Sequence, residues 1–410
     1  MNPKSILFPL ALFTACEPTL PKGDYQFDSD SASEDSNTTD SAEDPSDDTD
    51  SPTDPIDPDT GSDTDTDTDT GADTDTGEPP EQRITCQHQA QFVTPIDFEY
   101  FKVGDPIDAT VQMDPLTDYT GYSIRWEDSA ENEIGLETVS GTGGANYAGT
   151  DFTQTKGLNR VYARLVTPEG ICDTRAEKPI TVCQSELVET FSSPQSNWVT
   201  HGDAYWDSGG WMEMTGIASG KKGAVFNPTD SIASGAASIR FTLRTGGGYN
   251  SGADGFAFTI IDIGNPQDLV PLLNQARSGS GLAYGFGGTY GNWNGDALTV
   301  EIDTWHNTYN GTNELHTDPT TASHIALTKN ADPSNHMVWF ETPTVEDNQP
   351  HQIRVDVLNG AIRVFYDGAE VIYQQVVINF KGGQMFFSGS TGWATNYHVF
   401  DDLEILHECQ

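Results

Sequence analysis

The chain has 410 residues, a length that predicts two or three domains. Its 63 acidic and 19 basic side chains give a formal net charge of −44 at pH 7. Because nucleic-acid binding depends on neutralising phosphates with Lys and Arg, a chain this acidic is not expected to bind nucleic acid.

The first sixteen residues have the pattern of an export signal. An apolar run over residues 6–15 is too short to span a bilayer but suits the core of a secretory signal. It ends in "LFTAC" (12–16), which resembles the bacterial lipobox, where small residues precede the cysteine that becomes lipidated. We therefore predict a lipoprotein signal peptide over 1–16 and an exported protein anchored through Cys16 to a bacterial membrane, at the cell surface. The alternative is an ordinary signal followed by an unmodified thiol.

Residues 17–84 form an acidic segment of low complexity. They hold 23 Asp and Glu against Lys22 and Arg83, a net charge of −21, and only two aromatic residues. Such a composition cannot bury enough apolar surface to offset the entropy of ordering, and its charges keep the chain extended. We predict a disordered linker that would hold the folded part away from a membrane.

Four cysteines follow the signal region, an even number that indicates two disulfides in an exported protein. Three pairings are possible. We favour Cys86–Cys172 together with Cys183–Cys409. The second pair brackets residues 184–408, and the two ends of a β-sandwich domain often lie on adjacent strands.

Residues 85–183 are expected to form a small all-β module. Its predicted strands, which alternate in polarity or are rich in β-forming residues, lie at 108–113, 122–128, 160–167 and 178–182. Trp126 in a central strand, with cysteines near both ends, resembles an immunoglobulin-like β-sandwich. We see no polar cluster here that suggests chemistry, so a structural or spacer role is expected.

Residues 184–410 are expected to form one larger all-β domain. One short helix is predicted within 265–276, and otherwise turns rich in Gly and Asn separate strands. The predicted strands are 237–245, 255–262, 297–305, 324–330, 336–342, 351–359, 361–368, 370–377, 383–390 and 398–406. Many strands without helices predict a two-sheet sandwich of jelly-roll type.

The stretch "LTVEIDTWHN" (298–307) carries the strongest signal for a site. Glu301, Asp303, Trp305 and Asn307 follow one another at a spacing of two, which in a strand places all four on one face. Carboxylates gathered on one face repel one another unless a cation lies between them.

Two later residues, Asp318 and His324, extend this set of metal ligands. Calcium prefers oxygen ligands, which Asp303, Asn307, Asp318 and a backbone carbonyl near Trp305 can supply. Manganese accepts carboxylates and an imidazole, which Glu301, Asp303, Asp318 and His324 can supply. Read singly, an Asp before proline is usually a turn former and a lone His is usually at the surface. The combination is far more specific than its parts.

"VEIDTWHN", then "DP", then "HIAL" resembles the metal-binding stretch of the legume-type (L-type) lectins. Three other blocks agree along the chain: "ADGFAFTI" (253–260), "SGSGLAYGFGG" (278–288) and "FSGSTGWATNYHVFDDLEI" (387–405). The resemblance covers residues 184–410 and implies a concanavalin-like jelly-roll sandwich that binds glycans reversibly and with calcium. It assigns no oligomeric state.

The resemblance also implies roles for individual residues. Asp254, after a cis peptide bond from Ala253, would accept hydrogen bonds from two sugar hydroxyls. Asn307 would bind calcium through one amide atom and donate to the sugar through the other. Trp305 would give calcium its carbonyl and stack its ring on the sugar.

Glycines and the C-terminal loop complete the implied sugar site. Gly281 is the expected backbone donor, with Gly279 and Gly285 as alternatives. Candidates for contacts that set sugar preference are Thr391, Gly392 and Asn396. The loop between Asn307 and Asp318 is longer than in plant members, and lectins of this type outside plants can lack manganese. Calcium is therefore the expected ion. Whether manganese also binds, at Glu301 and His324, stays open.

Two other functions compete with the lectin hypothesis. Jelly-roll glycoside hydrolases of the laminarinase type, which act on β-glucans, carry E-x-D-x-x-E or E-x-D-x-E in a related strand and need paired carboxyls. Here positions 305 and 306 are Trp and His, so the third carboxylate is missing. The second alternative is a structural adhesin domain in which calcium only stabilises the fold and no sugar is bound. Calcium that only stabilises the fold would not require Asp254 next to the metal-binding loop.

Overall fold

The structure, a computed structural model, describes residues 81–115, 118–232, 236–249, 252–312, 314–358, 360–377 and 383–409. The predicted signal peptide, Cys16 and nearly all of the predicted linker lie outside these residues. Within them, no helix combines the length and the apolar character needed to cross a membrane.

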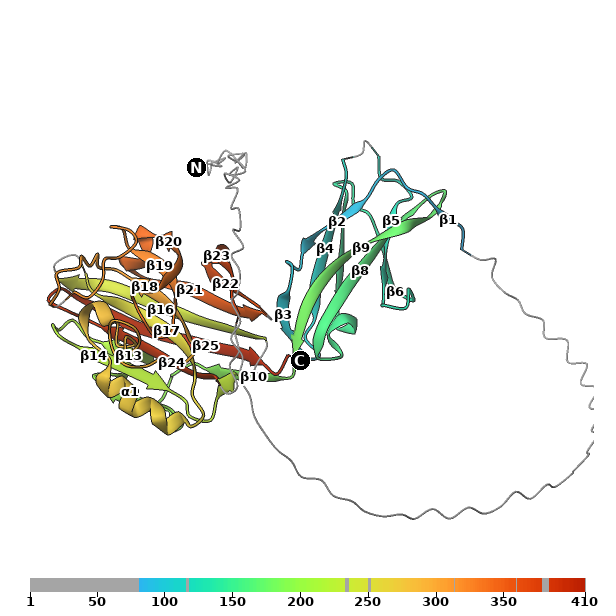
Figure 1. Cartoon of the computed structure of the whole chain (residues 1–410). Helices are drawn as coiled ribbons and strands as arrows, with labels where there is room; N and C mark the ends of the chain where they lie inside the picture. The colour runs from blue at the N-terminus through green and yellow to red at the C-terminus, as the bar shows by residue number, and fades with distance from the viewer. Residues whose placement is uncertain are drawn as a thin grey trace, which may run out of the picture. The chain divides into compact units, whose positions relative to one another are not determined.

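The N-terminal module is a two-sheet β-sandwich (Figure 1). One sheet has the order β1-β9-β8-β5-β6, with β3 pairing β9, and the other has the order β2-β4-β7. The strands are β1 (Arg83–Ile84), β2 (Ala90–Thr94), β3 (Glu99–Lys102), β4 (Ile107–Met113), β5 (Ser123–Glu127), β6 (Glu133–Thr138), β7 (Gly144–Gly149), β8 (Gly157–Thr167) and β9 (Gly170–Cys183). The immunoglobulin-like character of this module stays a prediction.

The core of this module surrounds Trp126, which is fully buried against the rings of Phe92 and Tyr147. The predicted linker ends earlier than expected, because residues 83–84 form β1 and pair in parallel with β9. Just before them, the Glu81 carboxylate bonds the Arg125 guanidinium at 2.6 Å. Charge pairing and strand addition therefore tie the last linker residues to the module.

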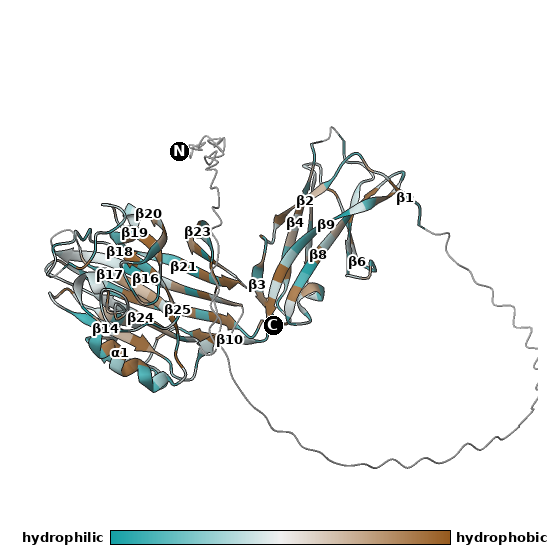
Figure 2. Cartoon of the chain, viewed as in Figure 1, coloured by the Kyte–Doolittle hydropathy of each residue, from teal (hydrophilic) through white to brown (hydrophobic). Residues whose placement is uncertain are grey.

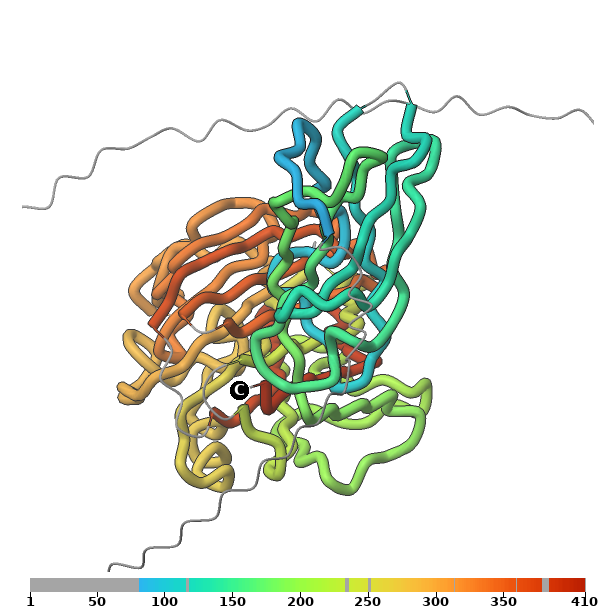
Figure 3. Tube along the Cα trace, turned by 90° about the vertical axis from the view of Figure 1, so that its right-hand side faces the viewer, coloured from blue at the N-terminus to red at the C-terminus, as the bar shows by residue number. Residues whose placement is uncertain are grey.

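The C-terminal domain is a jelly-roll sandwich of two eight-stranded sheets. One sheet has the order β12-β13-β25-β16-β21-β22-β23, with β10 pairing β25. The other has the order β11-β14-β24-β17-β18-β19-β20, with β15 pairing β24. Figure 3 shows the orange and red strands of this domain running side by side.

The first strands of the domain are β10 (Ser185–Glu189), β11 (Val199–Gly202), β12 (Tyr205–Asp207), β13 (Trp211–Thr215), β14 (Lys222–Phe226), β15 (Ser231–Ile232), β16 (Ala237–Tyr249) and β17 (Gly255–Asp262). Helix α1 (Leu269–Gln275) follows and confirms the single short helix predicted within 265–276. The later strands are β18 (Ala297–Asp303), β19 (His324–Lys329), β20 (His336–Glu341), β21 (Asp347–Leu358), β22 (Ala361–Tyr366), β23 (Ala369–Gln375), β24 (Gly383–Ser390) and β25 (Thr395–His407).

Alternation of polar and apolar residues explains how the sheets pack. Figure 2 shows hydrophobic and hydrophilic segments alternating along strands such as β16, β21 and β25. Phe256, Phe258 and Ile260 of β17 lie in the core between the two sheets, whereas Ala257 and Ile261 pack on the outer face with helix α1. A period of two therefore gives this sheet two buried faces.

Both disulfides form in the favoured pairing, Cys86–Cys172 and Cys183–Cys409. The first lies within the N-terminal module. The second joins the end of β9 to the residue that follows the last strand by two positions, so it closes the C-terminal domain as predicted.

Candidate functional site

Strand β18 positions the two acidic residues that begin the candidate site. Leu298, Val300 and Ile302 point into the core between the sheets. The alternate residues Glu301 and Asp303 therefore lie on the outer face of the same sheet, where both are buried. Two buried carboxylates on one face repel each other unless a cation lies between them, as the sequence analysis expects.

The strand ends at Asp303, earlier than predicted. The side chain of Asp303 accepts the backbone N–H of Trp305 at 2.8 Å, and this turn takes the chain out of the sheet. The expectation that residues 301, 303, 305 and 307 share one strand face is therefore wrong beyond Asp303. Asn307 reaches the site from the loop instead.

The loop holds Asn307 against Asp318. The Asn307 N–H donates to Asp318 Oδ2 at 2.5 Å, and the Asp318 N–H donates to the Asn307 carbonyl at 3.1 Å. The second oxygen of Asp318 accepts His316 Nε2 at 2.6 Å. These bonds orient a buried carboxylate whose oxygens retain lone pairs for a cation.

Asp254 enters the site from the start of β17. The peptide bond between Ala253 and Asp254 is cis, as the resemblance implied. The Asp254 carbonyl accepts the Thr304 N–H at 2.9 Å, and its own N–H donates to the Ser390 carbonyl at 2.9 Å. The side chain is only 3% exposed, and its Oδ2 has no side-chain or backbone hydrogen-bond partner at normal geometry within the described residues.

Two glycines lie directly against the Asp254 carboxylate. A Cβ on Gly392 would lie 2.9 Å from Asp254 Oδ2, and one on Gly279, whose φ is +67°, would lie 3.9 Å from Oδ1. A Cβ on Gly281, the expected donor, would instead meet Arg277 and Tyr290. The structure therefore places the alternative, Gly279, beside the carboxylate.

Thr391 and Asn396 are buried, and their side chains hydrogen-bond to the backbone of neighbouring segments. Thr391 Oγ1 donates to the Ala218 carbonyl at 2.6 Å and accepts the Lys221 N–H at 2.9 Å. Asn396 accepts the Gly248 N–H at 3.2 Å. Of the three residues predicted from this loop, Gly392 is the one placed next to Asp254.

Burial and neighbouring negative charges raise the pKa of both Asp254 and Asp303. Burial, together with the nearby charge of Glu314, raises the pKa of Asp254 to about 8. Burial and the charges of Asp318 and Glu301 raise the pKa of Asp303 well above its usual range. A positive ion close to these oxygens would lower both values again.

One predicted calcium ligand, Asn307, has a buried oxygen that a cation could satisfy. Asn307 Oδ1 is buried and, in the described part of the chain, unpartnered, as is Asp254 Oδ2. An amide oxygen and carboxylates are the hard donors that calcium takes. Asn307, Asp318 and Asp303, with the Trp305 carbonyl, are the residues that would hold it.

A histidine-rich cluster adjoins this set. Across the described residues, two groups bring their ligand atoms within 4.8 Å of one another: Glu301 with His324 and His336, and His316 with Asp318 and His336. Neither group includes Asp303. Sequence reasoning missed His316, which lies two residues before Asp318 in the same loop, and His336, which the register of β20 against β19 brings here.

Two further residues of the site carry no signal in the sequence motif. The Glu314 carboxylate accepts Asn307 Nδ2 at 2.9 Å, so it occupies the donor that the resemblance reserves for a sugar. Trp393, directly after Gly392, is 75% exposed. Trp393 lies inside the block 387–405 but is not among the residues predicted from it.

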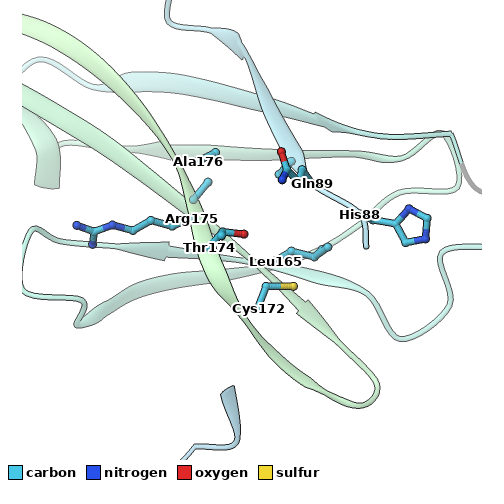
Figure 4. Close-up of a pocket in the computed structure, with 9 residues that line it drawn as sticks. His88, Gln89, Leu165, Cys172, Thr174, Arg175 and Ala176 are labelled. Atoms are coloured by element: carbon cyan, nitrogen blue, oxygen red, sulfur yellow. The ribbon is translucent and has the colours of Figure 1, made fainter. Parts of the chain in front are cut away.

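The N-terminal module has a small cavity of about 80 Å³ beside its disulfide, lined by residues that include Cys172 and Leu165 (Figure 4). His88 and Arg175 in its lining point away from each other, and its described lining has no carboxylate. This cavity therefore has no paired groups for acid–base chemistry.

No protein-family model and no curated protein matches the chain. In fold, the chain is similar to the exoplasmic/lumenal domain of VIP36 in its Ca²⁺/Man₃GlcNAc-bound form, at 14% identity and a TM-score of 0.41, over 54% of this chain and 88% of that domain. It is also similar to the lectin from Bauhinia forficata in complex with GalNAc, at 18% identity and a TM-score of 0.42, over 55% and 99%. A third similar structure is winged bean acidic lectin with methyl-α-D-galactose, at 16% identity and a TM-score of 0.43, over 54% and 97%.

Proposed function

We propose that residues 184–410 bind glycans reversibly and that calcium is required for this binding. The observation that carries the proposal is the buried Asp254 carboxylate, which has an unpartnered oxygen and lies close to Gly279 and Gly392, where a Cβ on Gly392 would crowd it. A carboxylate in this setting can accept hydrogen bonds from two neighbouring hydroxyls, the pattern that a sugar ring offers.

Calcium would organise the loop that completes the site. Its charge would offset the repulsion among Asp303, Asp318 and Asp254 and would fix Asn307 through the amide oxygen. With Oδ1 on the ion, the Asn307 amide nitrogen points its hydrogens outward, where Glu314 now accepts one. A sugar hydroxyl would replace Glu314 as the acceptor, with Trp305 and Trp393 offering faces for stacking.

The glycoside hydrolase alternative finds less support. Glu301 would be its nucleophile, but both of its oxygens are engaged, by Tyr284 Oη at 2.5 Å and His336 Nε2 at 2.6 Å. A nucleophile must reach the anomeric carbon of its substrate. Binding without turnover is therefore the function we propose.

The test is a glycan array with the purified chain, with calcium and with EDTA. We expect binding that EDTA abolishes and that Asp254→Asn weakens by at least about 100-fold, since charge-assisted hydrogen bonds contribute about 1.5–3 kcal/mol each. Asp268→Asn, the same charge change at an exposed residue next to helix α1, is the matched control. Undiminished binding by Asp254→Asn would sink the proposed site.

We also propose that Cys16 carries the lipid that displays the domain on a bacterial surface. The lipobox-like "LFTAC" (12–16) supports this. Cys16→Ser should move the protein from the membrane fraction to the medium, and an unchanged distribution would argue for an ordinary secretory signal.

A further inference from the structure

Glu314 brings a second carboxylate to the proposed sugar site. Its Oε2 accepts Asn307 Nδ2 at 2.9 Å, the same donor that the family resemblance assigns to a sugar. Glu314 lies in the loop between Asn307 and Asp318, which is longer here than in plant members of that family. The resemblance therefore assigns no role to Glu314.

Hydrogen bonds within the loop hold Glu314 in this position. Its N–H donates to Asn310 Oδ1 at 3.1 Å, and its carbonyl accepts the Asn310 N–H at 3.2 Å. The Tyr309 N–H donates to Thr317 Oγ1 at 3.0 Å. These bonds close the loop on itself, and the closed loop directs the Glu314 carboxylate toward Asn307.

The surroundings of Asp254 are negatively charged. Burial raises the pKa of its carboxyl, and so do the charges of Glu314 and Asp318, Glu314 more strongly than Asp318. Asp254 is 3% exposed, and its Oδ2 has no hydrogen-bond partner in the described part of the chain. A calcium ion would offset the charges of Asp303 and Asp318. Asp254 and Glu314 are then the two carboxylates left without a positive partner.

The basic side chains nearest in the chain, as far as the structure describes it, leave this charge unbalanced. Lys221 bonds the C-terminal loop through its backbone, but its ammonium lies 2.7 Å from the Asp203 carboxylate, which neutralises it. Arg277, just before the Gly-rich loop, is exposed, and its charge is not among those that shift the pKa of Asp254. A ligand with a positive charge would therefore complete the site.

We propose that the site prefers glycans with a free amino group and that Glu314 sets this preference. The inference rests on the proposed function. When a sugar hydroxyl replaces Glu314 as the acceptor of Asn307 Nδ2, the released carboxylate lies beside the ligand and can accept a hydrogen bond from its ammonium group. Hydrogen bonds that involve charged groups are roughly twice as strong as those between neutral groups.

Aromatic side chains on the surrounding loops also favour a cationic ligand. Tyr309, two residues after Asn307, is 63% exposed, and Trp393, directly after Gly392, is 75% exposed. The face of an aromatic ring attracts a cation. A sugar that carries a carboxylate would instead meet Asp254 and its acidic neighbours, and like charges brought together oppose binding. The groups that favour an amino sugar therefore disfavour an acidic one.

The experiment compares matched ligands by calorimetry on the full chain at pH 7 with saturating calcium. The methyl glycosides of glucosamine, galactosamine and mannosamine are each paired with the parent sugar, which has a hydroxyl in place of the amine. In at least one pair we expect the amino sugar to bind at least about fivefold more tightly than its parent. This preference should fall as salt is added, because the Glu314 carboxylate is only partly buried.

Glu314→Gln keeps the shape of the side chain and removes its charge. It should abolish most of the preference, change the affinity for the parent sugars by less than about threefold, and leave calcium affinity unchanged. Glu137→Gln, the same charge change at an exposed residue of β6, is the matched control and should keep the preference. Arg277→Gln should keep it as well.

The outcomes separate this inference from the proposed function. Equal binding of amino and parent sugars, or a preference that persists in Glu314→Gln, would overturn the inference and leave glycan binding standing. Loss of calcium affinity in Glu314→Gln would identify Glu314 as a calcium ligand and would also overturn it. So would tighter binding of acidic sugars that Arg277→Gln abolishes. Binding of none of these sugars, nor of any glycan on the array, would refute the proposed function itself.

Discussion

We expect one imidazole, His398 of strand β25, to make the stability of the C-terminal domain sensitive to acid. The ring is 0% exposed, Nδ1 lies 2.6 Å from Thr215 Oγ1, and Nε2 is unpartnered among the described residues. Burial lowers the pKa of His398 to about 3, whereas a histidine in an unfolded chain titrates near 6.5. Between about pH 3 and 6.5 the folded protein therefore keeps this ring neutral while the unfolded chain protonates it.

The sign of the effect follows from proton linkage. Between pH 6.5 and about 3 the unfolded state binds a proton that the folded state does not, so folding stability falls as the pH is lowered. The slope is about 1.4 kcal/mol per pH unit, and lowering the pH from 6.5 to 5 costs about 2 kcal/mol. At pH 7.5 this contribution of His398 to the free energy of unfolding is fully present.

Urea denaturation of the wild type and His398→Gln, at pH 7.5 and 5.0 with calcium held constant, measures this difference. The wild type should lose about 2 kcal/mol more on acidification than the variant. Comparing the two pH values removes any fixed cost of the substitution. A difference between the two proteins that stays the same at both pH values would refute the reasoning.

His351 offers a control of opposite sign. Although its partial burial lowers the pKa, the hydrogen bonds to Asp367 at 2.8 Å and Asp347 at 3.1 Å raise it overall. A raised pKa contributes stability that is present at low pH and is lost as the pH rises through the folded value. His351→Gln should therefore lose more stability at pH 5.0 than at pH 7.5, opposite to the pattern for His398→Gln.

Three further predictions concern the site itself. Asp303→Asn should raise the melting temperature in EDTA, because it removes a buried charge whose pKa is raised by burial and by Asp318. In calcium at 100 times its Kd, the free energy of unfolding should rise by about 2.7 kcal/mol for the wild type only. A variant that is less stable than the wild type in EDTA would contradict this prediction. Trp393→Ala should weaken glycan binding about three- to tenfold in calorimetry with an unchanged melting temperature, since the ring is exposed; a lower melting temperature would show that it packs instead. Glu314→Gln should lower the pH at which glycan binding at limiting calcium is half-maximal, because it removes a negative charge that raises the pKa of Asp254. An unchanged half-maximal pH would show that Glu314 does not influence the protonation of Asp254.

The later strands could be predicted closely because their signal is local. From β16 to β25 each observed strand overlaps a predicted range, since β-branched and aromatic residues alternate with polar ones and Gly or Asn marks the turns. Strands β10 to β15 were missed. They are at most five residues long and include "VTHG" and "YWD", which carry no alternation to detect. Pairing with longer strands, such as β25 and β24, holds them in the sheets.

The residues of the site also differ in whether a local pattern in the sequence identifies them. Asp254, Asn307 and Asp318 could be named in advance because the short motifs that contain them resemble those of the L-type lectins. His336 could not, because its approach to Glu301 depends on how β20 pairs with β19, and that pairing shifts register between Leu327 and Thr328. A bulge of this kind decides which side chain reaches which face, and no local pattern in the sequence reveals it.

Apolar and acidic side chains alternate along β18. The apolar ones pack into the core between the sheets, and the acidic ones lie at the candidate site on the outer face. Moving its register by one residue would place Glu301 and Asp303 in the apolar core and Val300 and Ile302 on the outer face, so the core itself holds the acidic residues in position. The outer face is also buried, which raises the cost of each unpaired charge and makes a cation the natural partner. Under the proposed function, metal dependence would belong to the loops that leave this face, whereas the core between the sheets consists of apolar side chains. Removing calcium should accordingly loosen the loop that carries Asn307 before it weakens the sandwich beneath.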